Sequence, residues 1–537
     1  MIKYFVFFCC IFTLLTRAQI QEDAWVYFRD KPHATAFLEA PQRMLSPKAL
    51  DRRQRQNILI TIDDVPVYPV YVTAVTNGDV QVLSRSKWLN ALHVQGTQQQ
   101  INALADLSFV REIIFANRSL TGTGRMQEPE VLNPVAAPKD FAAIQRNAVQ
   151  PLQNQQLELP FLHQLNYTGS GVDIAIMDAG FPGVDTQSPF ASLHQNNQIG
   201  STYDFVSRSP FVYHKSNHGT MVLSTMGVTV PNQFVGSAPE AKYHLFITED
   251  YMRETPLEES LWVEALEKAD SLGVSIVNTS LGYTTFDRSD YNYQYADLNG
   301  STTFSSKGAI HAKATGMMLV NSAGNWGSAG WYYIGTPSDS PGVLTVAAVN
   351  SSGVRSNFSS YGPAADGRLK PEVAALGSQA QVYNENGMFT AVNGTSFSAP
   401  ILAGAIGCLW QAFPNKTVDE LLDIVKRSSH QYQTPDVSLG YGIPNFRTAY
   451  NASLNTAIYQ VSKATVFPNP FADDVIFKWH NNETEGIVKV FNNLGQIVQE
   501  SRVIENQLLH LAALKPGIYI YELQLSDAVY TGKIIKK

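Results

Sequence analysis

Asp178, His218, Asn325 and Ser396 each stand in a short segment marked by glycine, namely DAGF, NHGT, SAGN and NGTSFSAP. A serine hydroxyl attacks a carbonyl efficiently when a neighbouring base takes its proton and a carboxylate orients that base. Hydrogen-bond donors must also hold the oxyanion that develops. The four residue types therefore match the groups that peptide hydrolysis through a serine requires.

Asp178 and His218 lie where the boundaries of a strand and a helix would present them. Asp178 ends the apolar run IAIM, and a carboxylate at the carboxyl end of a parallel strand points into the crevice where α/β proteins bind ligands. His218 precedes the run 221–227, which predicts a helix, and the unperturbed pKa of histidine, about 6.5, suits a base. Taken singly, Asp178 also fits a solvated turn, and a lone histidine is more often structural.

Ser396 lies just before the apolar run Ile401–Trp410, which predicts a helix. Gly394 permits a tight turn before the hydroxyl, and the free N–H groups of a helix start favour negative charge. The backbone N–H of Ser396 is thus one candidate oxyanion donor, and the amide of Asn325 is another. In isolation, GTS is compatible with a helix cap and SAGN with an ordinary turn.

The combination and order of these motifs resemble the subtilisin-like (subtilase) serine peptidases over about 300 residues. His218 follows Asp178 by 40 residues, and Ser396 follows His218 by 178. The segment NTSLGY at 278–283 adds to the likeness. The resemblance implies a secreted serine endopeptidase with Asp178, His218 and Ser396 as the catalytic triad and Asn325 as the oxyanion donor. The alternative is an inactive subtilase fold that serves as an adhesin or scaffold.

The resemblance also implies where a polypeptide substrate binds. Ser280, Leu281 and Gly282 match the segment that pairs with the substrate backbone as an edge strand. Ala323 and Gly324 match one wall of the S1 pocket, and Gly335 is expected near its floor. A glycine floor predicts that the pocket accepts a large apolar side chain.

The chain departs from the family pattern in two places. Ala179 follows the catalytic aspartate, and residues 284–306 are interpreted as an insertion beside the substrate strand that restricts or extends the cleft. The chemistry requires no cofactor. Structural calcium is frequent in the family, but no local carboxylate loop assigns a metal site, so the metal ligands stay unknown.

The elements that must position these residues form a parallel sheet. Short apolar runs typical of strands buried on both faces alternate with helical patterns through residues 151–455. The expected fold class is therefore α/β, with a three-layer, parallel-sheet catalytic domain. The predicted strands are 172–177, 243–247, 274–277 and 317–320. Residues 257–272 are predicted to form a helix.

The chain before this domain is predicted to hold three segments. Residues 1–18, with Lys3 and a short apolar run, are typical of an export signal, with a membrane anchor as the alternative. Residues 19–118 alternate strands and helices, and this α+β pattern resembles the inhibitory propeptide of subtilases. Residues 119–150 are rich in Gly, Pro and polar residues, which indicates an exposed linker. The alternative for residues 19–118 is an ordinary accessory domain.

Residues 465–537 are predicted to form a small antiparallel β-sandwich. Short β-type runs are separated by turn residues such as Asn492-Asn493 and Pro516-Gly517. FPNPF at 467–471, LKPGIYIYEL at 514–523 and the ending TGKIIKK resemble the C-terminal sorting domain of type IX secretion. That implies export through the periplasm of a Gram-negative bacterium, with release and surface attachment both open. The alternative is a β-sandwich that binds carbohydrate or protein.

The amino-acid composition is that of a globular protein and argues against a disordered chain. The 537 residues are 44% hydrophobic and 16% charged, with a formal net charge of -7, so nucleic acid is not an expected partner. After removal of the signal, Cys408 is the single cysteine. Its apolar surroundings predict a buried, inert thiol rather than a nucleophile.

Overall fold

The computed structural model describes residues 20–120, 151–454, 465–479, 484–525 and 529–537. The predicted signal peptide, residues 1–18, and nearly all of the predicted linker lie outside the described residues. Contacts divide the chain into two units, Met1–Ala452 and Ser453–Lys537, and each is described by itself.

The N-terminal domain is an antiparallel sheet in the order β2-β3-β1-β4. Its strands are β1 Gln21–Phe28, β2 Gln81–Ser86, β3 Ala91–Thr97 and β4 Val110–Phe115. Side chains of β1 alternate between two cores, as a period of two requires. Val26 and Phe28 pack with the domain's own helices, whereas Trp25 and Tyr27 pack against the larger domain. Both faces of this small sheet are therefore covered.

The larger domain is built on a sheet of parallel strands in the order β13-β12-β11-β10-β5-β9-β6. The strands are β5 Asp173–Asp178, β6 Ile199–Asp204, β9 Lys242–Ile247, β10 Ile276–Thr279, β11 Met318–Ser322, β12 Val343–Val349 and β13 Val373–Leu376. All of β5 and β12 is buried, which explains their continuous apolar runs.

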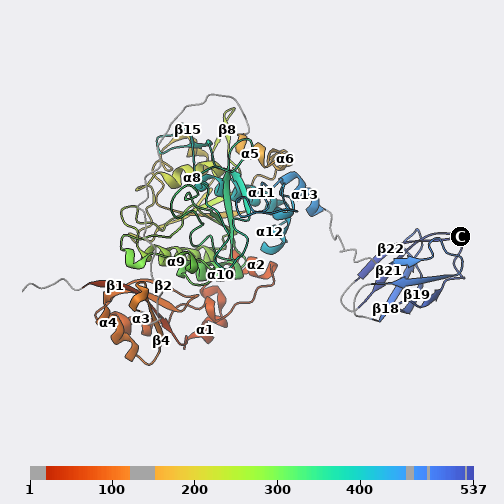
Figure 1. The fold of residues 1–537 in the computed structure, drawn as a ribbon, viewed down its shortest axis with the longest axis horizontal. Coiled ribbons are helices and arrows are strands. Elements are labelled where there is room, and N and C mark those ends of the chain that lie inside the picture. Colours follow the sequence, from red (N-terminus) through yellow and green to blue (C-terminus); the bar gives the residue numbers. More distant parts are fainter. Residues whose placement is uncertain (1–19, 121–150, 455–464, 480–483, 526–528) are drawn as a thin grey trace, which may run out of the picture. The chain divides into compact units, whose positions relative to one another are not determined.

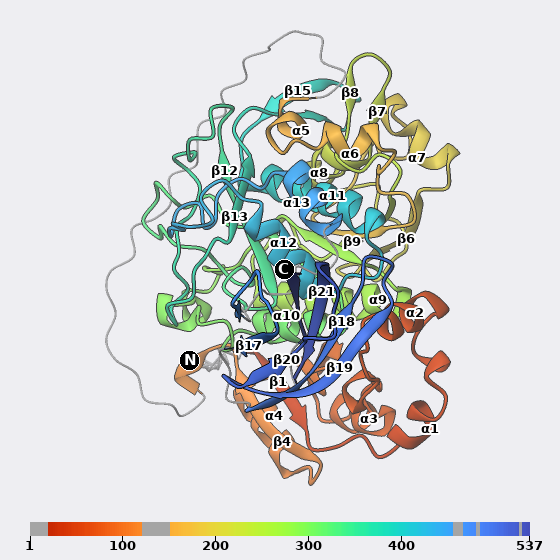
Figure 2. The same cartoon turned by 90° about the vertical axis from the view of Figure 1, so that its right-hand side faces the viewer.

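Helices cover both faces of this sheet and complete the three layers (Figures 1 and 2). On one face lie α8 His218–Gly227 and α11 Thr395–Ala412, which pack with Ile174 and Ile176 of β5. On the other face lie α9 Pro256–Leu272 and α10 Phe304–Ala314. These two helices separate the large sheet from the N-terminal domain (Figure 1). The predicted three-layer α/β fold is confirmed.

Short elements complete the first unit. Its remaining helices and strands are α1 Ala34–Leu38, α2 Pro47–Arg55, α3 Pro69–Thr76, α4 Gln98–Ala103, α5 Leu152–Gln156, α6 Pro160–Gln164, α7 Ala191–Gln195, α12 Val418–Arg427, β7 Thr229–Val230, β8 Phe234–Val235, β14 Ala380–Tyr383 and β15 Phe389–Val392. A last helix, α13 Phe446–Leu454, runs to the boundary with the second unit. No helix in the described ranges is long and apolar enough to span a membrane.

The second unit is the predicted antiparallel β-sandwich. One sheet holds β16 Thr465–Phe467, β17 Asp474–Lys478 and β20 Leu508–His510. The other holds β18 Glu485–Phe491, β19 Ile497–Ile504, β21 Gly517–Gln524 and β22 Val529–Lys536. Apolar side chains from both sheets, including Phe477, Val490 and Leu523, share one core.

Two boundaries differ from the sequence predictions for a local reason. The strand predicted at 274–277 begins at Ile276, because Gly273 ends α9 in the left-handed region and Val274 still donates to Ala269 of that helix. The predicted insertion 284–306 ends at Thr303, whose hydroxyl caps α10. The interpretation of Cys408 is confirmed, since it is a buried free cysteine and burial raises the pKa of its thiol.

Candidate active site

Asp178 and His218 form a hydrogen-bonded pair at the carboxyl end of β5. Asp178 is the last residue of that strand, is fully buried, and accepts from the N–H of Ala179 at 2.8 Å. His218 is the first residue of α8, and its Nδ1 lies 2.8 and 3.0 Å from the two carboxylate oxygens of Asp178. Nδ1 therefore carries a proton, which leaves Nε2 able to accept one.

Gly219 makes this approach of helix to strand possible. A Cβ at that position would lie 2.5 Å from the carbonyl oxygen of Gly180 and 3.0 Å from Cβ of Asp178. Any side chain would therefore push the start of α8 away from β5. The glycine of NHGT serves the geometry of the pair rather than a turn.

The environment of His218 favours its protonated form. Burial alone lowers the pKa of the imidazole, but the charge of Asp178 and its hydrogen bonds outweigh burial, so the pKa of His218 lies above its ordinary value of 6.5. The side chain remains 29% exposed, and its ring packs against that of Phe397 at 5.9 Å between centroids. The imidazole thus lies beside the start of α11, at the edge of solvent.

Ser396 stands in the first turn of α11, shortly after a backbone conformation that favours glycine. Gly394 has a φ of 155° and a ψ of 146°, in a region that side chains disfavour. In the described structure the hydroxyl of Ser396 donates to the carbonyl of Ser280 at 3.3 Å, and not to His218. Catalytic hydrogen bonds are often unformed in ligand-free enzymes and tighten with substrate.

Asn325 is held with its amide nitrogen available for donation. The backbone N–H of Thr395 donates to Oδ1 of Asn325 at 2.9 Å, and the Thr395 hydroxyl lies 3.0 Å from the same oxygen. A backbone N–H can only donate, so Oδ1 must face Thr395 and Nδ2 must face away. The N–H of Ser396 lies in the first turn of α11, where N–H groups have no intrahelical partner. These two donors suit an oxyanion.

The predicted substrate strand follows β10 directly. Ser280 donates its hydroxyl to the carbonyl of Ser396 at 2.8 Å, which ties this segment to α11. The carbonyl of Leu281 accepts from the side chain of Asn321 at 2.9 Å. Within the described residues, neither backbone group of Gly282 has a hydrogen-bond partner. The segment therefore keeps free pairing groups beside Ser396.

The residues expected at S1 surround an indole ring rather than an open pocket. Ala323 is fully buried. A Cβ built on Gly324 would lie 2.4 Å from the ring of Trp326, and one on Gly335 would lie 3.1 Å from it. In this conformation the indole of Trp326 lies beside Gly324 and Gly335, and the acceptance of a large apolar side chain stays a prediction.

Two residues of the site were missed by the sequence patterns. Thr395 orients Asn325, and Trp326 covers the glycines. Both are direct neighbours of predicted site residues, which was the only available signal. In the described ranges no group of three or more His, Cys, Asp or Glu residues could hold a metal ion.

The N-terminal domain is held on α9 by a buried ionic cluster. Asp270, fully buried near the end of α9, lies 2.5 Å from Arg52, 3.2 Å from Arg53 and 3.3 Å from Lys87. Burial alone would raise the pKa of Asp270, but these cations lower it below its usual value. The carboxylate is thus ionised and paired across the domain boundary.

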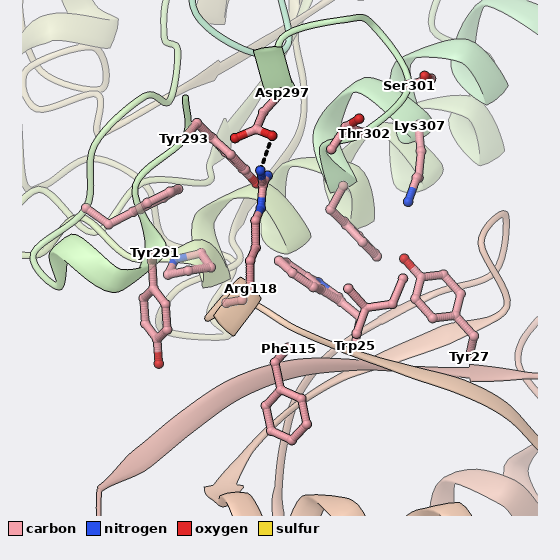
Figure 3. Close-up of a pocket in the computed structure, with 15 residues that line it drawn as sticks. Trp25, Tyr27, Phe115, Arg118, Tyr291, Tyr293, Asp297, Ser301, Thr302 and Lys307 are labelled. Atoms are coloured by element: carbon pink, nitrogen blue, oxygen red, sulfur yellow. Dashed lines mark ion pairs between the residues drawn. The ribbon is translucent and has the colours of Figure 1, made fainter. Parts of the chain in front are cut away.

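Residues 284–303 contact the N-terminal domain rather than standing free beside the cleft. Arg288 binds the carboxylate of Glu22 at 3.0 Å, and Arg118 forms an ion pair with Asp297. Arg118 and Asp297 both line a cavity of about 450 Å³. Figure 3 shows Arg118 pointing toward Asp297, with Trp25 on the side of the N-terminal domain. The segment therefore adds contact area to this interface.

Three family profiles match the chain. Residues 23–131 match the description "Peptidase S8 propeptide domain, Bacteroidota", residues 169–442 match "Subtilase family", and residues 465–537 match "Secretion system C-terminal sorting domain". The profiles fall on the N-terminal domain, the parallel-sheet domain and the β-sandwich.

Several curated proteins are similar to the chain. Subtilisin NAT of Bacillus subtilis subsp. natto is 30% identical over 303 residues, which cover 56% of this chain and 71% of that protein. Subtilisin of Bacillus pumilus is 28% identical over 302 residues, covering 56% and 98%. The crystal structure of MycP1 from Mycobacterium smegmatis is 22% identical, covers 59% of this chain and 86% of its own, and superimposes with a TM-score of 0.45, too low to support a conclusion.

Proposed function

Because this chain belongs to the subtilase family, we propose that Asp178, His218 and Ser396 are its catalytic triad and that Asn325 completes the oxyanion hole. The protein is a serine endopeptidase of the subtilisin type with a propeptide domain and a secretion sorting domain. The observation that supports the residue assignment is the bifurcated hydrogen bond from Nδ1 of His218 to the two carboxylate oxygens of Asp178, at 2.8 and 3.0 Å.

The reaction follows from the donors and acceptors around Ser396. A polypeptide pairs with Ser280–Gly282, and its N–H takes the carbonyl of Ser280 that the Ser396 hydroxyl now occupies. The freed hydroxyl gives its proton to Nε2 of His218 while Oγ attacks the scissile carbonyl carbon. Nδ2 of Asn325 and the N–H of Ser396 hold the oxyanion. His218 then protonates the leaving amine, and water hydrolyses the acyl-enzyme by the same steps.

Replacing the nucleophile tests this assignment against the inactive-scaffold alternative. Ser396→Ala should abolish casein cleavage and leave the circular dichroism spectrum unchanged. Ser398→Ala is a matched control, because its buried hydroxyl lies in the same turn and donates only to the carbonyl of Thr395. The control should keep most of the activity. Undiminished cleavage by Ser396→Ala would assign the chemistry to another group.

The N-terminal domain is proposed to be an inhibitory propeptide that is removed during maturation. Its sheet covers α9 and α10 through buried aromatic and ionic contacts, including Trp25 and Asp270. Residues 121–150, which follow this domain in the sequence, lie outside the described residues. N-terminal sequencing of the active secreted enzyme tests this proposal. Active enzyme that still begins before Trp25 would contradict it.

We further propose the domain limits 1–18 for a signal peptide, 19–118 for the propeptide, 119–150 for a linker and 151–455 for the peptidase. The sandwich at 465–537 would direct export through the type IX machinery from the periplasm of a Gram-negative bacterium. The sorting-domain profile supports this proposal, and so does the sandwich core, which is made only of residues of the second unit. A chain lacking 465–537 should accumulate inside the cell. Fractionation of cells and medium would also decide between surface attachment and release, and normal export would refute the role.

A further inference from the structure

Three glycines from separate segments converge on the side chain of Trp326, the residue after the oxyanion donor. A Cβ on Gly324 would lie 2.4 Å from Cζ3 of its ring, and a Cβ on Gly335 would lie 3.1 Å from the same atom. A Cβ on Gly282 would lie 3.7 Å from Cη2. A Cβ on each of these glycines would contact the indole, so the ring lies in the space between them. A Cβ on Gly282 would lie nearer the carbonyl oxygen of Thr336, at 3.4 Å, and one on Gly335 would lie equally close, at 3.1 Å, to Cγ2 of Thr284.

The contacts explain why glycine stands at two of these positions. Distances under 3.0 Å do not occur for real Cβ atoms, and the backbone of Gly324 has a φ of 99° besides. A side chain at Gly324 would therefore displace the indole and strain the backbone, and Gly335 leaves its Cβ only a tight fit. At Gly282 an alanine would make ordinary contact. The glycines accommodate Trp326 rather than a large substrate side chain.

The backbone on either side of the indole is anchored. The N–H of Trp326 donates to the hydroxyl of Ser360 at 3.0 Å, and the N–H of Gly327 donates to the carbonyl of Phe358 at 2.8 Å. Asn325, on the other side, is held by Thr395. The loop therefore keeps its place, and only rotation of the side chain could empty the space.

We propose that Trp326 fills the primary specificity pocket and restricts this peptidase to small side chains, such as Ala, Gly or Ser, at the P1 position. The proposal rests on the assignment of the catalytic site above. A bulky P1 side chain would collide with the indole or displace it, and displacement removes its packing against the glycines. An Ala side chain has no atoms beyond Cβ, so it neither collides with the indole nor displaces it.

The test uses the mature secreted enzyme and two p-nitroanilide tetrapeptides that differ only in Ala or Phe at P1. The wild type should cleave the Ala substrate with a kcat/KM at least about tenfold above that for Phe. Trp326→Ala should raise kcat/KM for the Phe substrate by roughly 10- to 150-fold and so lower the Ala-to-Phe ratio by that factor, since burial of a Phe side chain in the vacated space is worth about 1.5–3 kcal/mol. Trp331→Phe is the matched control in the same loop, and it should keep the wild-type ratio.

Product mapping on the wild type supplies a readout that needs no variant. Peptides from a digested denatured protein should end mainly in small residues. A wild type that prefers Phe, or a Trp326→Ala ratio equal to the wild-type ratio, would overturn the inference. Either result would leave the catalytic assignment intact, because cleavage that depends on Ser396 is measured separately. If Trp326→Ala does not fold, Trp326→Leu should shift the ratio in the same direction.

Discussion

The buried carboxylate of Asp270 is predicted to hold the propeptide on the peptidase domain. It is fully buried, and its three partners from the N-terminal domain, Arg52, Arg53 and Lys87, are 3%, 4% and 11% exposed. Asp270→Asn would leave Arg52 with the carbonyl of Val274 as its acceptor and without its counter-charge. Arg53 would keep its pair with Asp64 at 2.7 Å.

Removing one partner of a buried ion pair typically costs about 3–5 kcal/mol. The asparagine retains an acceptor oxygen and Arg53 retains Asp64, so the lower end, about 3 kcal/mol, is expected for this variant. That corresponds to more than about a hundredfold in the constant for opening the interface, since 1.4 kcal/mol is tenfold. The matched control is Asp51→Asn, because Asp51 pairs with Arg55 at an exposed site and is 58% exposed. It should cost less than about 0.5 kcal/mol.

Hydrogen exchange on the full chain measures this opening directly. A Ser396→Ala background keeps the propeptide uncleaved in both variants. The backbone N–H groups of Ser46, Lys87 and Trp88 donate across the interface to Ser271 and Glu267 of α9, so opening exposes them. Asp270→Asn should speed exchange of these amides by more than about a hundredfold, while those of β11 and β12 keep their protection. Exchange of the amides of Ser46, Lys87 and Trp88 within about twofold of the Asp51→Asn control would refute the reasoning.

Two further predictions concern the catalytic groups. The pKa of His218 is raised above 6.5 by Asp178, and only the neutral imidazole accepts a proton, so kcat/KM should fall on the acid side with a midpoint above pH 6.5. Asp178→Asn removes that cause and should lower the midpoint as well as the rate, by up to about ten-thousandfold; a pH–rate profile with an unchanged midpoint would argue against the pairing. Asn325→Ala should lower kcat by about 100- to 1000-fold with little change in KM. A rise in KM at constant kcat would instead assign Asn325 to ground-state binding.

The sequence alone determined much of the local structure around the chemistry. Asp178 follows a short apolar run that predicted a buried strand, and Ser396 precedes a longer apolar run that predicted a buried helix; the structure has both. Such patterns are local because strand and helix periods are written in neighbouring residues. β3 lacks a clear apolar alternation, since His93 on this strand is buried with its Nδ1 2.8 Å from the hydroxyl of Ser260 of α9.

Only the tertiary structure decided how these groups are oriented and covered. The amide of Asn325 could face either way until Thr395, 70 residues later, set its direction. Trp326 fills the space that the glycine motif alone predicts to be open. Arg52 meets Asp270 across 218 residues. These features depend on side chains that distant segments bring into contact, and no periodicity along the chain encodes such a contact.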